Sequence, residues 1–168
     1  MFPPEIDFAY EKIKLILFYL GRIIKYYLDI RSTGDCVNTH ICRGNYHSTF
    51  FSSGAYDFVA PELFGEENVN AYYLEFDDER SGSFAPLKFV SGEKKVVLGL
   101  ITTKTPELED REVIKKRIAQ AAKIIPLDRL CLSPQCGFAS CAIGNKLTEE
   151  QQWAKLKLVK EIAEEVWG

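Results

Sequence analysis

The chain has 168 residues, of which 46% are hydrophobic and 27% charged, values that exclude a disordered or fibrous protein and favour one globular domain. Its formal net charge of −3 argues against a basic surface for nucleic acid or for an anionic membrane. The five cysteines, odd in number and low in density, together with the absence of a signal peptide, predict a cytoplasmic protein.

Residues 5–30 are predicted to form one long helix after Pro3 and Pro4. Apolar side chains cover most of its circumference, so we expect it to pack against another subunit or against material that this chain lacks. A helix on a membrane surface is the alternative, but the basic residues are few and scattered. A turn at residues 32–35 leads out of this helix, which predicts an N-terminal unit over 1–34 and a single domain over 35–168.

From residue 37 onwards, predicted strands alternate with predicted helices. The strands cover residues 37–41, 71–75, 94–101 and 130–133, and the helices cover 56–64, 110–124 and the segment after a capping box at Thr148. Val113 on the second helix and Trp153 on the third are assigned to inward faces. Strands separated by helices predict an α/β fold with parallel pairing, which places chemistry at the carboxyl ends of the strands.

Potential metal ligands lie at three of these strand ends. His40 and Cys42 are two residues apart, so they share one face of the first strand and provide half of a tetrahedral zinc site. Glu75 closes the second strand and Cys136 follows the fourth. A buried cysteine or a solvated glutamate is the plain interpretation of any single one of them, but their convergence favours a metal.

Five segments together resemble the cobalamin-independent methionine synthase family, in particular its short bacterial members, over residues 38–168. They are Thr-His-Ile-Cys-Arg-Gly-Asn (39–45), Leu-Glu-Phe-Asp-Asp-Glu-Arg-Ser-Gly (74–82), Leu-Gly-Leu-Ile-Thr-Thr-Lys (98–104), Leu-Cys-Leu-Ser-Pro-Gln-Cys-Gly-Phe (130–138) and Leu-Thr-Glu-Glu-Gln-Gln-Trp-Ala-Lys-Leu (147–156). The resemblance implies that these residues form half of a (β/α)8 TIM-type barrel, corresponding to its strands five to eight. It also implies a zinc site of His40, Cys42, Glu75 and Cys136.

The function that the resemblance implies is methyl transfer from methyltetrahydrofolate to the zinc-bound thiolate of homocysteine, which gives methionine. Asp77, Asp78, Arg80 and Ser81 are candidates for substrate contacts, although loop polarity or ion pairs would explain them equally well. Lys104 lies nearest to the position of the family's proton-donating histidine. His47 is more readily explained as a solvated loop residue, and Cys131 as a core residue; Cys36 and Cys141 have no identified partner.

Two alternatives stay open. The first is that the chain is a non-catalytic fragment with a structural zinc. The second is that it is a zinc thiol methyltransferase that uses a corrinoid or another methyl donor. A half barrel has two open parallel edges, so we expect either a homodimer or association with a separate N-terminal half.

Overall fold

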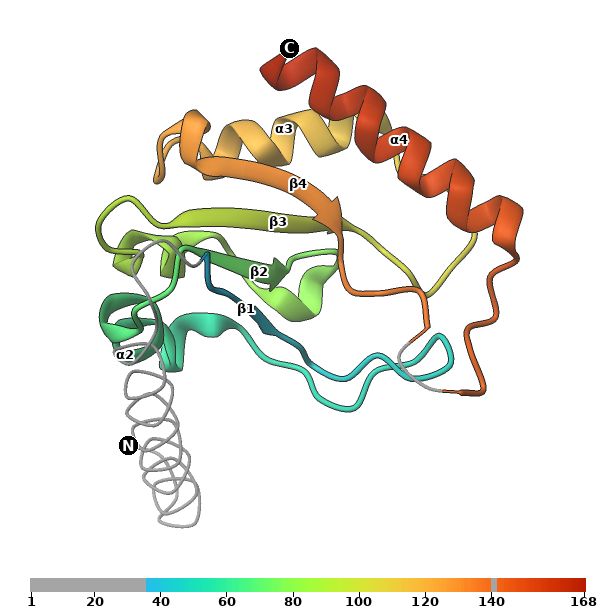
Figure 1. The fold of residues 1–168 in the computed structure, drawn as a ribbon, viewed down its shortest axis with the longest axis horizontal. Helices are drawn as coiled ribbons and strands as arrows, with labels where there is room; N and C mark the ends of the chain where they lie inside the picture. The colour runs from blue at the N-terminus through green and yellow to red at the C-terminus, as the bar shows by residue number, and fades with distance from the viewer. Residues whose placement is uncertain (1–35, 140–141) are drawn as a thin grey trace.

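The computed structural model describes residues 36–139 and 142–168, which form one α/β unit (Figure 1). Its strands are β1 (Asn38–Ile41), β2 (Ala71–Glu75), β3 (Lys95–Ile101) and β4 (Leu130–Pro134). They make one parallel sheet in the order β1-β2-β3-β4, so each strand pairs with the next along the chain. The predicted strands and their parallel pairing are confirmed. The predicted helix over 5–30 and the boundary at residue 34 lie outside the described residues.

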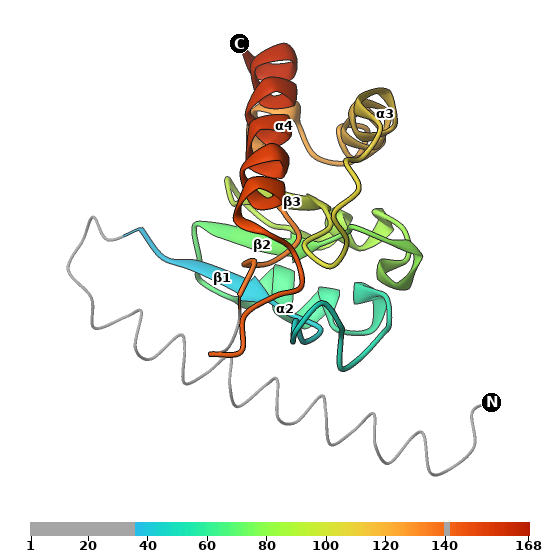
Figure 2. The same ribbon diagram turned by 90° about the vertical axis from the view of Figure 1, so that its right-hand side faces the viewer.

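In the described part of the chain, three α-helices and four short 3-10 segments lie between the strands or follow the last of them. They are η1 (Tyr56–Phe58), α2 (Ala60–Glu66), η2 (Glu79–Ser81), η3 (Ala85–Phe89), α3 (Arg111–Ala121), η4 (Leu127–Arg129) and α4 (Glu149–Trp167). Helix α4 packs against β4 and α3, whereas α2 packs against η3 at the other end of the sheet (Figures 1 and 2). The predicted helix over 56–64 is two pieces, because Pro61 has no N–H and starts a new helix at α2. Among the described helices, none has both the length and the apolarity needed to cross a membrane.

Buried aromatic and aliphatic side chains fill the space between the sheet and these helices. Tyr72 and Phe64 are fully buried, with ring centroids 5.0 Å apart, and Phe76 lies 4.8 Å from Phe84. Every residue of β3 after Lys95 is buried, as expected for a central strand of a parallel sheet. The carboxyl ends of β2 and β3 therefore emerge from a tightly packed layer, which is a rigid base for side chains that must keep fixed positions.

Two predicted core residues are exposed, which corrects the predicted helix faces. Val113 is 51% exposed and Trp153 is 59% exposed. The inner face of α4 carries Leu158 and Ile162, with Lys155 fully buried one turn earlier. The Lys155 ammonium donates to the carbonyl oxygen of Glu107 at 2.6 Å and to the Glu109 carboxylate at 3.1 Å. Because Lys155 faces inward, the buried face of α4 differs from the face that its apolar residues predict. The sequence alone does not show that Glu109 is the partner of this lysine.

Candidate metal centre

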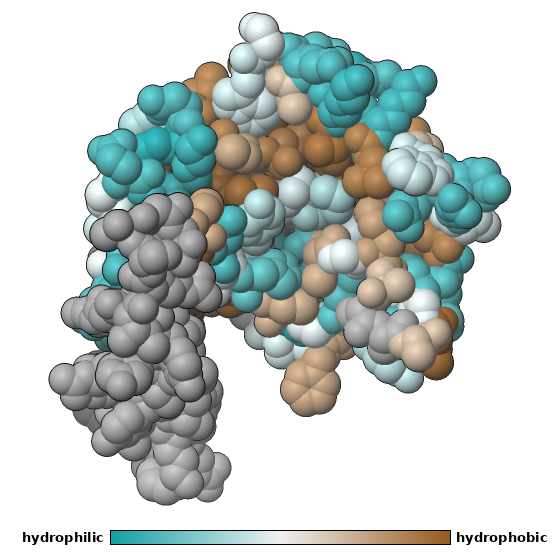
Figure 3. Space-filling view, viewed as in Figure 1, coloured by the Kyte–Doolittle hydropathy of each residue, from teal (hydrophilic) through white to brown (hydrophobic). Residues whose placement is uncertain are grey.

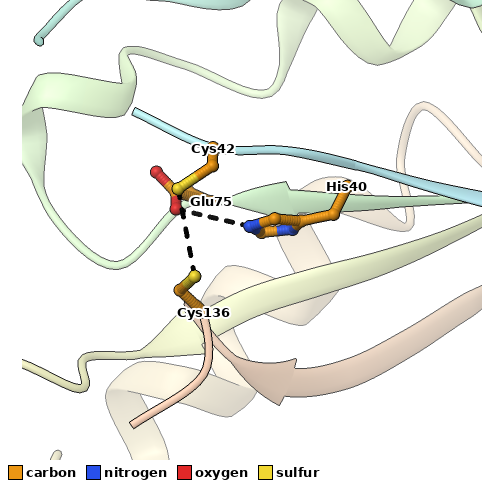
Figure 4. Close-up of side chains that lie close together, drawn as sticks. All are labelled: His40, Cys42, Glu75 and Cys136. Atoms are coloured by element: carbon orange, nitrogen blue, oxygen red, sulfur yellow. Dashed lines mark hydrogen bonds and ion pairs between the residues drawn. The ribbon is translucent and has the colours of Figure 1, made fainter. Parts of the chain in front are cut away.

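Four side chains from three strand ends meet at the carboxyl edge of the sheet (Figure 4). His40 comes from β1, Cys42 follows it, Glu75 ends β2 and Cys136 follows β4. One donor atom of each lies within 4.8 Å of the donor atoms of the other three. The structure therefore brings together all four residues that the sequence analysis selected as metal ligands.

The spacing of these donor atoms fits a tetrahedral zinc ion. The sulfur atoms of Cys42 and Cys136 are 3.9 Å apart, and His40 Nε2 is 3.7 Å from Glu75 Oε1. With ordinary zinc–ligand bond lengths, the edges of a tetrahedron are about 3.8 Å between two sulfurs and about 3.4 Å between nitrogen and oxygen. These two distances are within a few tenths of an ångström of the tetrahedral edges, and all pairs of donor atoms lie within 4.8 Å.

Backbone contacts orient the two ligands that β1 provides. The His40 Nδ1 atom lies 3.1 Å from the carbonyl oxygen of Tyr73, which can only accept, so Nδ1 carries the hydrogen. That tautomer directs Nε2 toward the other ligands, as in many zinc sites. The Gly44 amide donates to the sulfur of Cys42 at 3.2 Å. Gly44 has a φ of +83°, and a Cβ there would lie 2.6 Å from the Cβ of Phe51, so the turn requires glycine.

Glu75 is the most buried of the four candidate ligands, with 2% of its surface exposed. Its Oε2 atom accepts from the backbone N–H of Arg43 at 2.9 Å, and its Oε1 atom accepts from Gln135 Nε2 at 2.5 Å. The guanidinium of Arg43 lies 3.8 Å from Oε2 and also donates to the Glu75 carbonyl oxygen and to the hydroxyl of Tyr56. Because both oxygens have donors, the carboxylate holds one orientation without a metal.

A change in register at the end of β3 directs Gln135 and Cys136 toward the site. The β3–β4 pairing shifts between Gly99 and Ile101. The backbone N–H of Gln135 donates to the carbonyl oxygen of Ile101 at 2.7 Å. A Cβ on Gly99 would lie 2.8 Å from both Gln135 Cα and the carbonyl oxygen of Leu74. Only glycine allows the two backbones to come this close, so Gly99 is a structural requirement of the site.

The electrostatics of the four side chains favour positive charge at their centre. Hydrogen bonds that the His40 ring donates to Cys136 and Glu75 raise the pKa of His40 to about 10, so the ring is a cation at neutral pH. Burial, followed by the proximity of Glu75, raises the pKa of the Cys42 thiol to about 12. Burial alone would raise the pKa of Glu75, but His40 and the Arg43 amide lower it overall. His40 also lowers the pKa of Cys136. In the metal-free site, the His40 imidazolium thus balances the negative charge of Glu75 and Cys136, which a bound metal ion would balance in its place.

The predicted substrate residues lie after β2, outside this group of four ligands. Asp77 forms an ion pair with Lys104 at 3.1 Å, and Arg80 contacts Asp78 at 2.5 Å. Ser81 is buried, and its backbone N–H donates to the Asp78 carbonyl oxygen at 3.2 Å. Asp77 and Asp78 also line a hollow of about 730 Å³, and exposed Val113 is another of its lining residues. The role of Asp77, Arg80 and Ser81 in substrate binding stays a prediction.

Four buried polar residues around the site were missing from the prediction: Arg43, Asn45, Thr103 and Gln135. Two of them directly neighbour a predicted ligand in the sequence, which is the one signal that could have identified them. His47 and Cys131 contribute no atom to the group of four. Cys36 is exposed, and Cys141 lies outside the described residues.

Comparison with known proteins finds one matching family and several similar proteins. Residues 34–165 match the family described as the catalytic domain of cobalamin-independent synthase. Two uncharacterised proteins of Bacillus subtilis (strain 168), YxjH and YxjG, are 55% and 54% identical to this chain over 132 residues. Each match covers 78% of this chain but 35% of the relative, so the chain spans about a third of the length of these curated proteins.

Two solved structures share the fold. One, from Listeria monocytogenes, is provisionally assigned as a vitamin-B12-independent methionine synthase and has 42% identity and a TM-score of 0.68. That match covers 88% of this chain and 40% of the other. The second is a B12-independent methionine synthase from Shewanella sp. W3-18-1 in complex with selenomethionine, with 24% identity and a TM-score of 0.64. It covers 82% of this chain and 40% of the Shewanella chain, and at that identity it supports the fold alone.

Proposed function

The chain belongs to the cobalamin-independent methionine synthase family, and we propose that it carries a zinc-dependent methyl-transfer site of that type. The main support is the convergence of two thiols, one imidazole and one carboxylate, with donor atoms within 4.8 Å of one another. Thiolate and imidazole ligands select zinc over magnesium or calcium, which prefer oxygen. The proposed ligands are His40, Cys42, Glu75 and Cys136.

Bound zinc would lower the pKa of a coordinated substrate thiol, so that a thiolate nucleophile is present at neutral pH. The residues of the chain would hold the ligands in place and provide a ligand that can exchange. Glu75 is the proposed exchanging ligand, because Arg43 and Gln135 already provide hydrogen bonds for its carboxylate. A proton must also reach the departing amine of the methyl donor. Lys104 is the candidate donor, because it lies nearest to the position of the family's proton-donating histidine. Its ion pair with Asp77 would hold its ammonium group beside the loop that follows β2.

We propose homocysteine as the methyl acceptor and methyltetrahydrofolate as the donor, on the basis of the family. Because this chain spans 35% of the curated relatives, we expect part of both substrate sites to come from elsewhere. The corresponding proposal for the fold is that residues 35–168 form the C-terminal half of a β/α barrel.

The edges of the sheet support this barrel proposal. Strands β1 and β4 each pair with one neighbour among the described residues. The N–H and C=O groups on an open strand edge favour pairing with another strand. An apolar band also crosses the middle of the surface below α4 (Figure 3). A second copy of the chain, or a separate N-terminal half, would cover both features.

The first experiment is zinc analysis of the purified chain, with its molar mass by light scattering and a methyl-transfer assay on the same sample. One zinc per chain, a homocysteine-dependent change in its coordination and methionine formation from methyltetrahydrofolate are expected. Zinc that does not respond to thiols would favour the structural alternative. Transfer only from a corrinoid donor would favour the related methyltransferase, and absence of zinc would overturn the proposal.

Zinc affinity should rise steeply with pH. Near neutral pH the metal-free site holds a proton on His40, whose pKa is about 10, and one on Cys42, whose pKa is about 12. Both protons must leave before these atoms bind a metal, so zinc competes with them less well as the pH falls. We expect at least about two protons released per zinc near neutral pH, and at least about a 100-fold gain in affinity per pH unit. Calorimetry in buffers of different ionisation enthalpy measures this release, and uptake without proton release would contradict the assignment of His40 and Cys42.

A further inference from the structure

Behind Glu75, a line of buried side chains joins the loops that follow β1, β3 and β4. Gln135 Nε2 donates to Glu75 Oε1 at 2.5 Å, and Thr103 Oγ1 donates to Gln135 Oε1 at 3.0 Å. Asn45 Nδ2 donates to Thr103 Oγ1 at 3.1 Å and to the carbonyl oxygen of Gly137 at 2.6 Å. The exposed fractions are 6% for Asn45, 0% for Thr103 and 2% for Gln135, so water competes little for these bonds.

The direction of every bond in this line is fixed by its two ends. The Glu75 carboxylate can only accept, so the amide NH2 of Gln135 must face it and the amide oxygen must face Thr103. That oxygen can only accept, so the Thr103 hydroxyl donates to it and receives the N–H of Asn45 in turn. The Gly137 carbonyl oxygen likewise requires the NH2 of Asn45 to point toward it. The three bonds from Asn45 through Thr103 and Gln135 therefore all run toward Glu75, and bonds aligned in this way strengthen one another.

We infer that Thr103, together with Gln135 and Asn45, is a positioning residue that holds Glu75 ready to leave and rejoin the metal. This rests on the proposed function, in which a substrate thiol replaces Glu75 at zinc. A buried carboxylate that leaves a metal is costly unless donors receive it. The line from Asn45 supplies such a donor at Oε1, while the Arg43 amide supplies one at Oε2. The same contacts fix the side chain when it coordinates.

Thr103 gives the sharpest test, because it touches no ligand and permits nearly isosteric changes. Thr103→Val removes the hydroxyl and keeps the volume, whereas Thr103→Ser keeps the hydroxyl. We expect Thr103→Val to weaken zinc binding about 10-fold in competition with a chromophoric chelator, and Thr103→Ser to restore it to within about threefold. In the cobalt-substituted protein, Thr103→Val should also need about 10-fold more homocysteine to change the visible spectrum. Thr102→Val, which removes the neighbouring hydroxyl outside this line, is the matched control.

The outcomes separate this inference from the proposed function. If the unmodified chain binds no zinc, the proposed function fails first and the inference fails with it. If it binds zinc and responds to homocysteine, but Thr103→Val matches Thr103→Ser in both measurements, the inference alone fails. Should Thr103→Val not fold, Gln135→Met removes the same donor to Glu75 and must show the same two losses for the inference to stand.

Discussion

Replacement of Cys136 by serine should reduce zinc affinity by at least about 100-fold, more than loss of a residue that only supports a ligand. A serine hydroxyl stays protonated at neutral pH and is a poor zinc ligand, so one of the two thiolates is lost. The change preserves the volume of the side chain, and the contact of His40 with Cys136 shows that the sulfur faces the other ligands. Equilibrium dialysis against a zinc buffer at a fixed pH measures the loss.

Cys131→Ser is the matched control for this change. Cys131 lies on β4, five residues before Cys136, but it belongs to no metal-ligating group among the described residues. We expect its replacement to leave zinc stoichiometry unchanged. A full equivalent of zinc in both Cys42→Ala and Cys136→Ala would remove the basis of the proposed site, because each variant has lost one of the two thiolates that the site needs.

The convergence of the four candidate ligands was predictable from the sequence because each of them lies where a strand ends. In a parallel sheet those ends share one edge, so residues as distant in the chain as Cys42 and Cys136 are brought together by topology alone. The residue types then indicated the metal. Neither step requires knowledge of side-chain packing, which is why the grouping of these residues followed from topology.

The residues that support the ligands were not predictable in the same way. Thr103 and Gln135 are 32 residues apart, and their hydrogen bond depends on the register shift at Gly99. Polar residues of this kind look like ordinary loop residues in a sequence. The prediction of the inward face of α4 was wrong for a related reason. Buried Lys155 donates a hydrogen bond to Glu109, which is distant in the sequence, and no local pattern reveals this pair.

Replacement of Arg43 by methionine should lower the free energy of unfolding of the metal-free protein by about 3 kcal/mol, because it removes one of the two cations beside the buried Glu75 carboxylate and leaves the polar partners of the guanidinium without a donor. Arg43 is 7% exposed and Glu75 is 2% exposed. The guanidinium also donates to the carbonyl oxygen of Gly54 at 2.8 Å and to the Tyr56 hydroxyl at 3.0 Å, and it lies 4.1 Å from the centre of the Tyr56 ring. Methionine fills similar space and replaces none of these contacts. Urea unfolding in the presence of a chelator measures the change.

Two further variants show whether this effect depends on the buried site. Arg43→Lys keeps the charge, but one ammonium cannot reach Gly54 and Tyr56 together as the planar guanidinium does, so we expect an intermediate loss. Arg111→Met removes an arginine whose ion pairs with Glu161 and Glu165 lie at the surface, where such pairs contribute little. Equal losses for Arg43→Met and Arg111→Met would contradict a special role for Arg43. A large loss confined to Arg43→Met would mean that the loop carrying Cys42 is held by the same arginine that lies beside Glu75, so that the fold and the geometry of the candidate ligands depend on one side chain.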